Sequence, residues 1–73
     1  KTNINFNLKK SENVILNIYD ISGKKVETLV NKKLSQGDYK IEWNANQYSS
    51  GVYFYSLYID GKLIDSKKMI LMK

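Results

Sequence analysis

The stretch GVYFYSLYIDG, residues 51–61, decides the fold of this chain. Aromatic, β-branched and aliphatic residues fill most of it, a composition that favours a β-strand. Tyr53, Tyr55 and Leu57 alternate along it, and we expect them to face a core because successive side chains of a strand point to opposite faces. Asp60-Gly61 is the two-residue signal of a type I′ hairpin, so a return strand should follow.

Alternation of apolar and polar residues continues along the rest of the chain and predicts further strands. The expected strands are residues 4–8, 14–20, 25–30, 39–43, 52–59, 62–66 and 68–73. The third is the least regular, because its apolar residues would also suit one helical turn. Residues 31–38 should form a loop, with room for a short strand at Leu34. About seven short strands without a helix are typical of a sandwich or small barrel, and we expect an all-β, Ig-like antiparallel β-sandwich.

The composition excludes most catalytic and metal-binding chemistry. The 73 residues include no cysteine and no histidine, so disulfides, soft metal ligands and the usual catalytic bases and thiol nucleophiles are missing. The carboxylates lie mainly at expected turns and on solvent faces, without the clustered aspartates of a calcium loop. We therefore expect one domain that is not an enzyme and uses no cofactor or metal.

The positive charge is spread along the chain. All twelve basic residues are lysines, and with seven acidic residues they give a net charge of +5. Scattered lysine pairs without the bidentate guanidinium of arginine make a poor base-reading surface, so we expect no nucleic acid partner. Solvated strand ends and protected sheet edges account for them better. No run of 18 apolar residues is present, so the sequence predicts no transmembrane segment.

Six residues at turns and in the expected core are assigned structural roles: Gly23, Gly37, Trp43, Gly51, Tyr53 and Gly61. Gly51 should lie at a bend that excludes a Cβ atom. Tyr53 after it resembles the tyrosine corner of β-sandwiches, where the hydroxyl bonds back to the backbone. Trp43 is in phase with Tyr39 and Ile41, which places its side chain in the core.

The last expected strand contains the candidate recognition site, which consists of Lys67, Lys68, Met69, Ile70, Leu71, Met72 and Lys73. A terminal strand that ends a sheet leaves backbone groups unpaired, and a receptor can add a strand to such an edge. The lysines would suit an acidic receptor surface. The alternative is simply a buried strand between solvated lysines, and the four adjoining apolar residues leave its inward phase open.

In their order and spacing, these pieces resemble the type A C-terminal sorting domain of the type IX (Por) secretion system. Residues 2–8 resemble the family's opening strand, and residues 14–23 resemble its hydrophobic strand with a Tyr-Asp-x-x-Gly turn. Residues 37–44 and 50–55 follow in the family's order. The end, residues 68–73, is similar to the family's basic-apolar-basic terminus.

The resemblance implies a secretion signal in a Bacteroidetes-type bacterium. An N-terminal cargo domain of the same chain, and the family's usual Pro-Asn-Pro-rich lead-in, are expected before Lys1. The implied partners are the outer-membrane translocon, its shuttle components and a sortase-type cysteine peptidase. The implied destination is the cell surface or the medium, reached through the periplasm and the outer membrane. Ser56 departs from the family, which often has a basic residue there, without consequence for the fold.

A different interpretation treats the chain as an Ig-like or fibronectin-like accessory module that binds a polysaccharide or a protein partner. Its support is the pair of tyrosines expected to be exposed, Tyr48 and Tyr58. Two rings are few for a stacking platform. Export of a fused reporter supports the sorting signal, whereas polysaccharide binding that is lost in alanine variants of these tyrosines supports the accessory module.

Overall fold

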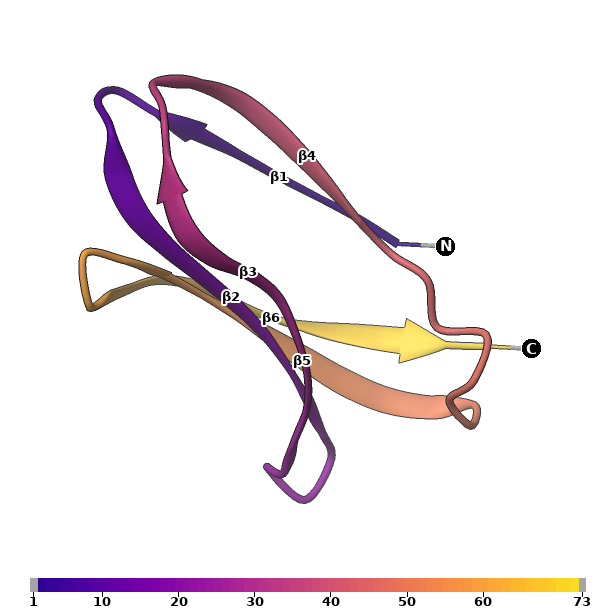
Figure 1. Ribbon diagram of the computed structural model, residues 1–73. Helices are drawn as coiled ribbons and strands as arrows, with labels where there is room; N and C mark the ends of the chain where they lie inside the picture. The colour runs from indigo at the N-terminus through magenta and orange to yellow at the C-terminus, as the bar shows by residue number, and fades with distance from the viewer. Residues whose placement is uncertain (1, 73) are drawn as a thin grey trace.

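Residues 2–72, which the computed structural model describes, form six β-strands and no helix (Figure 1). The strands are β1 (Thr2–Leu8), β2 (Glu12–Asp20), β3 (Lys25–Leu34), β4 (Gly37–Trp43), β5 (Gly51–Ile59) and β6 (Lys62–Leu71). β1 and β4 pair as a two-stranded antiparallel sheet, and the others form a four-stranded antiparallel sheet in the order β3-β2-β5-β6. The sheets form two layers, which confirms the predicted all-β sandwich (Figure 1).

The structure has six strands where the sequence predicted seven. The two strands expected after the hairpin are one continuous strand, β6, which stays paired with β5 from Lys62 to Leu71. The polar run at residues 65–68 indicated a break, but an edge strand tolerates charged residues because one of its sides faces solvent. The irregularity in this pairing lies elsewhere, where a register shift leaves Ile64 as the extra residue of a bulge.

β3 is longer than predicted and continues through residues 31–34, where the sequence indicated a loop. This segment pairs with the start of β2, so that Leu34 lies opposite Glu12. The pair Lys32-Lys33 is compatible with a strand because β3 is the other edge of the sheet. The strand expected at residues 25–30 is confirmed, and the helical alternative is wrong.

The core lies between the two sheets and follows the predicted alternation. The inward residues expected on β5, Tyr53, Tyr55 and Leu57, are all buried. Inward-facing residues of β2, which lies next to β5, and of the two-stranded sheet in the opposite layer belong to the same core cluster. The largest fully buried side chains are Trp43, Leu8, Leu16, Ile18 and Val14. The predicted core position of Trp43 is therefore confirmed.

The predicted turn glycines all have positive φ. Asp60 and Gly61, with φ of +50° and +82°, form the tight hairpin between β5 and β6, as a type I′ turn requires. Gly23 and Gly37 have φ of +89° and +148°. The crowding predicted at Gly51 is wrong, because no atom from beyond its chain neighbours lies within 4 Å of a Cβ built there; its φ of +156° is what favours glycine.

An aromatic cluster joins the two sheets near the start of β5. Trp43, only 1% exposed, packs against Tyr48 and Tyr53 with ring centroids 5.6 Å and 5.3 Å away. The Tyr53 hydroxyl donates to the Ser49 carbonyl oxygen at 2.8 Å, which confirms the expected bond back to the backbone. Glu27 Oε1 accepts hydrogen bonds from Trp43 Nε1 at 3.2 Å and from the Tyr48 hydroxyl at 2.9 Å. Glu27 of β3 therefore ties the cluster to the four-stranded sheet.

Candidate functional site

β6 is an edge strand. Within the described part of the chain its only strand neighbour is β5, so one side of its ten-residue backbone lacks a strand partner. Figure 1 shows β6 running toward the end of the molecule at which β1 begins. Unpaired N–H and C=O groups along such an edge can bond to an added strand, which makes β6 the first candidate site.

The pairing of β6 with β5 determines which apolar residues face the core. Met69 lies opposite Tyr53 and is buried, and Leu71, two residues on, is half-buried. Ile70 is 65% exposed, and Met72, directly after the strand, is 83% exposed. The inward phase that the sequence left open is therefore that of Met69 and Leu71.

The predicted recognition residues are thus divided between core and solvent. Lys67 and Lys68 are exposed, and Lys73 lies outside the described residues. The alternative, a strand buried between solvated lysines, describes only half of the four apolar residues, since two face the core and two face solvent. This segment is therefore held on the core by two apolar side chains while the other two remain exposed to solvent.

β6 also carries most of the exposed large hydrophobic side chains found among residues 2–72. They are Ile21, Leu63, Ile64, Ile70 and Met72. All except Ile21 lie on β6 or directly after it. Sequence reasoning missed Leu63 and Ile64, for which the available signal was two adjacent aliphatic residues directly after a tight turn. Exposed apolar side chains gathered on one element mark a contact surface.

The exposed charges of β6 are positive, those of Lys62, Lys67 and Lys68. The acidic residue of the strand, Asp65, is half-buried and accepts a hydrogen bond from the Tyr55 hydroxyl at 3.1 Å. Burial, followed by this bond to Asp65, raises the pKa of Tyr55. The edge therefore presents ammonium groups beside apolar side chains, a combination that complements a partner with carboxylates.

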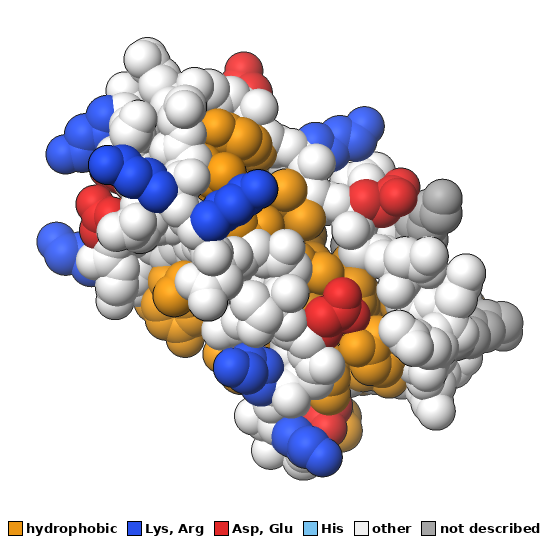
Figure 2. All heavy atoms as spheres, in the orientation of Figure 1, with side chains coloured by type: hydrophobic (Ala, Val, Ile, Leu, Met, Phe, Trp, Pro, Cys, Tyr) orange, Lys and Arg blue, Asp and Glu red, His pale blue; other side chains and the backbone are white. Residues whose placement is uncertain are grey.

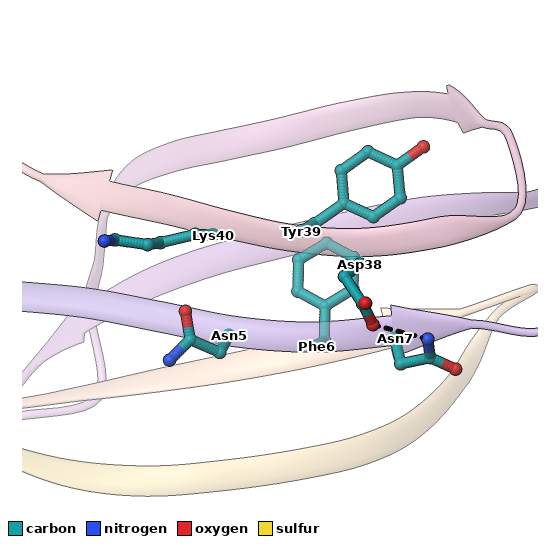
Figure 3. Close-up of a pocket in the computed structure, with 6 residues that line it drawn as sticks. All are labelled: Asn5, Phe6, Asn7, Asp38, Tyr39 and Lys40. Atoms are coloured by element: carbon teal, nitrogen blue, oxygen red, sulfur yellow. Dashed lines mark hydrogen bonds between the residues drawn. The ribbon is translucent and has the colours of Figure 1, made fainter.

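A second candidate is a hollow of about 440 Å³ formed by β1 and β4 (Figure 3). The residues that line it are Asn5, Phe6, Asn7, Asp38, Tyr39 and Lys40. The rings of Phe6 and Tyr39 stack on each other with centroids 5.3 Å apart. Asn7 Nδ2 donates to Asp38 Oδ1 at 2.6 Å. Because these two rings stack on each other and these two polar groups bond to each other, fewer groups in the hollow are available to bind a ligand than its residue types indicate.

The two tyrosines expected to be exposed are only partly accessible. Tyr48 is half-buried against Trp43. Tyr58 is half-buried on the four-stranded sheet, where a hydrogen bond with the Tyr19 hydroxyl is the main cause of its raised pKa. The predicted exposure of Tyr48 is therefore wrong, because its ring packs against the core and its hydroxyl bonds to Glu27. Tyr58 does lie on the side of the sheet turned away from the core, as its phase predicted, but it is only partly exposed.

Other classes of site find little support in the described residues. Between residues 2 and 72, no three side chains of His, Cys, Asp or Glu are grouped so that they could hold a metal ion. The same residues include no helix that is long and apolar enough to cross a membrane. Figure 2 shows lysine side chains scattered over one face, with hydrophobic side chains in a diagonal band among them. That face has no continuous basic surface for a nucleic acid.

Comparison with known families gives a match along practically the whole chain. Residues 1–72 match the family model described as "Secretion system C-terminal sorting domain". Searches of curated proteins and of solved structures gave no match. The family match agrees with the resemblance noted in the sequence, and the strands of the structure follow in the order which that resemblance implies. The chain therefore belongs to the family of C-terminal sorting domains of the type IX secretion system.

Proposed function

We propose that this chain is the export address of a cargo protein and that the type IX machinery binds it at β6. Membership of the family supports a C-terminal secretion signal for that system. In the proposal, residues 1–73 form one sorting domain that catalyses nothing, and the cargo precedes it in the same chain. Translocon and shuttle components recognise the domain, the cargo crosses the outer membrane to the surface or the medium, and a sortase-type cysteine peptidase removes the domain.

One observation supports β6 as the contact: exposed hydrophobic side chains lie on an unpaired sheet edge. Proteins usually protect such edges with charges, proline, bulges or a covering loop. β6 has lysines and a bulge, yet it also keeps Ile70 and Leu63 more than half exposed. Apolar residues retained at an edge despite this liability are accounted for by a partner that covers them.

Addition of a strand from the type IX machinery to β6 explains how the machinery would bind this edge. The backbone of an added strand would bond to the unpaired groups of β6, which gives affinity that depends little on side chains. Specificity would come from side chains on alternate faces. On β6 these are Lys68 and Ile70 on one face and Lys67 on the other, as the pairing with β5 places them.

The proposal is tested with a periplasmic reporter joined by a short linker to residues 1–73, in a bacterium that has the type IX system. The complete fusion should reach the surface or the medium. Deletion of residues 68–73 should leave the reporter in the periplasm. Equal surface delivery of both fusions would refute the role assigned to the end of the chain.

A point substitution separates recognition from folding. Ile70→Asp places a carboxylate on the edge, and Ile21→Asp makes the same change at a residue that is 72% exposed in the turn between β2 and β3. Both variants should fold, because neither side chain lies in the core, and only Ile70→Asp should reduce export. Thermal midpoints of the purified domains check folding, and equal export of the two folded variants would exclude β6 as the contact.

A further inference from the structure

The face of the four-stranded sheet that is turned away from β1 and β4, the outer face, is unusually apolar. The strand pairings define its composition, because residues opposite one another on neighbouring strands share a face. One row across the sheet, from β6 to β3, consists of Lys68, Phe54, Tyr19 and Lys25. Another row consists of Leu63, Tyr58 and Ile15.

A sheet that packs one face on a core normally has polar side chains on the other. Here Phe54, Tyr19 and Tyr58 are half-buried, although the second layer, β1 and β4, lies on the opposite side of the sheet (Figure 1). Leu63 and Ile70 are 56% and 65% exposed on the same outer face. Apolar area of this extent on one face marks a contact surface.

The polar groups between the two rows are already paired with one another. Thr28 Oγ1 donates to Asn17 Oδ1 at 2.8 Å, and Asn17 Nδ2 donates to the Tyr19 hydroxyl at 3.2 Å. Asn17 and Ser56, which lie opposite each other at the centre of the face, are each only 9% exposed. Covering this face would therefore leave few polar groups without partners, which lowers the cost of excluding water from it.

The charged residues among the paired positions of the outer face are all lysines. Lys25 and Lys68 flank the aromatic row, and no Asp or Glu belongs to the paired residues of this face between residues 13 and 70. Neighbouring strands are about 4.8 Å apart, so three spacings separate the two lysine positions by about 14 Å. The face thus has an apolar, aromatic centre with a cation on each side.

We propose that the outer face binds a protein surface that has an apolar centre and a carboxylate on each side of it, about 14 Å apart. A second copy of the chain is disfavoured, because two such faces of a chain with net charge +5 would meet without a carboxylate between them. A fluid anionic membrane lacks two carboxylates at a fixed separation. The inference goes beyond the sorting function, since the row crosses β2 and β3, which the edge contact at β6 leaves free.

The test uses the reporter fusion with residues 1–73, expressed in the same bacterium, with a photo-cross-linking amino acid at Phe54. The same probe at Lys40, an exposed residue of β4, serves as the control position. The cross-linked products are identified by mass spectrometry. Lys25→Glu is combined with the Phe54 probe, and Lys40→Glu, with the same change in charge, is its matched control. The circular dichroism and thermal midpoint of each purified domain check folding.

We expect the Phe54 probe to cross-link to a protein segment that contains apolar residues flanked by Asp or Glu, and the Lys40 probe not to do so. Lys25→Glu should reduce that product about tenfold or more, as loss of an interface anchor does, and Lys40→Glu should leave it unchanged. Cross-links only to lipid, only to a second copy of the chain, or to nothing overturn the proposal. Export of the same fusion is measured in parallel, so failure of the sorting function is seen separately.

Discussion

Replacement of Glu27 by alanine tests how the two layers are held together. Glu27 lies on β3, and its Oε1 accepts hydrogen bonds from Trp43 Nε1 at 3.2 Å and from the Tyr48 hydroxyl at 2.9 Å. Alanine removes this acceptor and with it both hydrogen bonds. The Tyr48 hydroxyl retains the Val26 carbonyl oxygen at 3.2 Å, whereas the indole N–H of Trp43, on a side chain only 1% exposed, would lose its acceptor.

The expected loss follows from that one unpaired donor. A buried donor left without an acceptor costs about 1–3 kcal/mol, so the free energy of unfolding should fall by about 2 kcal/mol for Glu27→Ala. At about 0.05–0.15 kcal/mol per residue, a domain of this length has about 4–11 kcal/mol in total, so the loss is a large fraction of its stability. The melting temperature should fall by roughly 8–16 °C.

Glu27→Gln is the matched control, because it keeps a side-chain oxygen that can accept from Trp43 and removes only the charge. Its cost should stay below about 1 kcal/mol. Urea unfolding followed by tryptophan fluorescence measures both variants. A loss below about 0.5 kcal/mol in the alanine variant, or equal losses in the two variants, would refute the role assigned to this carboxylate. Glu27→Ala should also lower the pKa of Tyr48, which burial and then the bond to Glu27 hold above its usual value.

Two further predictions concern the turns. Tyr53→Phe removes the hydroxyl that bonds to Ser49 at 2.8 Å and should reduce the free energy of unfolding by about 1 kcal/mol in urea unfolding without altering the far-ultraviolet circular dichroism. The pKa of Asp20 is lowered from 3.8, first by its bond from the Ser22 hydroxyl and then by that from the Lys24 N–H, so the unfolded chain takes up this proton before the folded one. The stability that the ionised Asp20 contributes is complete above pH 3.8 and is lost as the pH falls through the folded pKa. The difference in melting temperature between wild type and Asp20→Asn should therefore narrow at lower pH. A difference that stays constant with pH would contradict the assignment.

The features that could be predicted from the sequence are those that depend on local alternation and turn chemistry. Tyr53, Tyr55 and Leu57 are buried because the period of a strand places them on one face. The hairpin at Asp60-Gly61 forms because its positive φ values suit these two residues. The number of strands was harder to predict, since only the unbroken pairing with β5 shows that residues 62–71 form one strand.

The features that could not be predicted depend on contacts between distant strands. Four consecutive apolar residues near the end carry no period, and the inward position of Met69 is set by its pairing with Tyr53. The core position of Trp43 follows from alternation, but its hydrogen-bond partner Glu27 is brought to it only by the stacking of the two sheets. The hydrogen bond from Thr28 Oγ1 on β3 to Asn17 Oδ1 on β2 likewise requires that these two strands be neighbours.

The division of the last strand between core and solvent has a consequence for how an address of this kind is recognised. Met69 holds the strand on the core, and this contact fixes Ile70 on the outer face at the sheet edge. In an unfolded chain the same residues are exposed, but the row of oriented backbone groups along β6 does not exist, because only pairing with β5 creates it. A receptor that adds a strand to β6 therefore binds the folded sandwich in preference to the unfolded chain. Its binding would stabilise the fold in proportion to that preference.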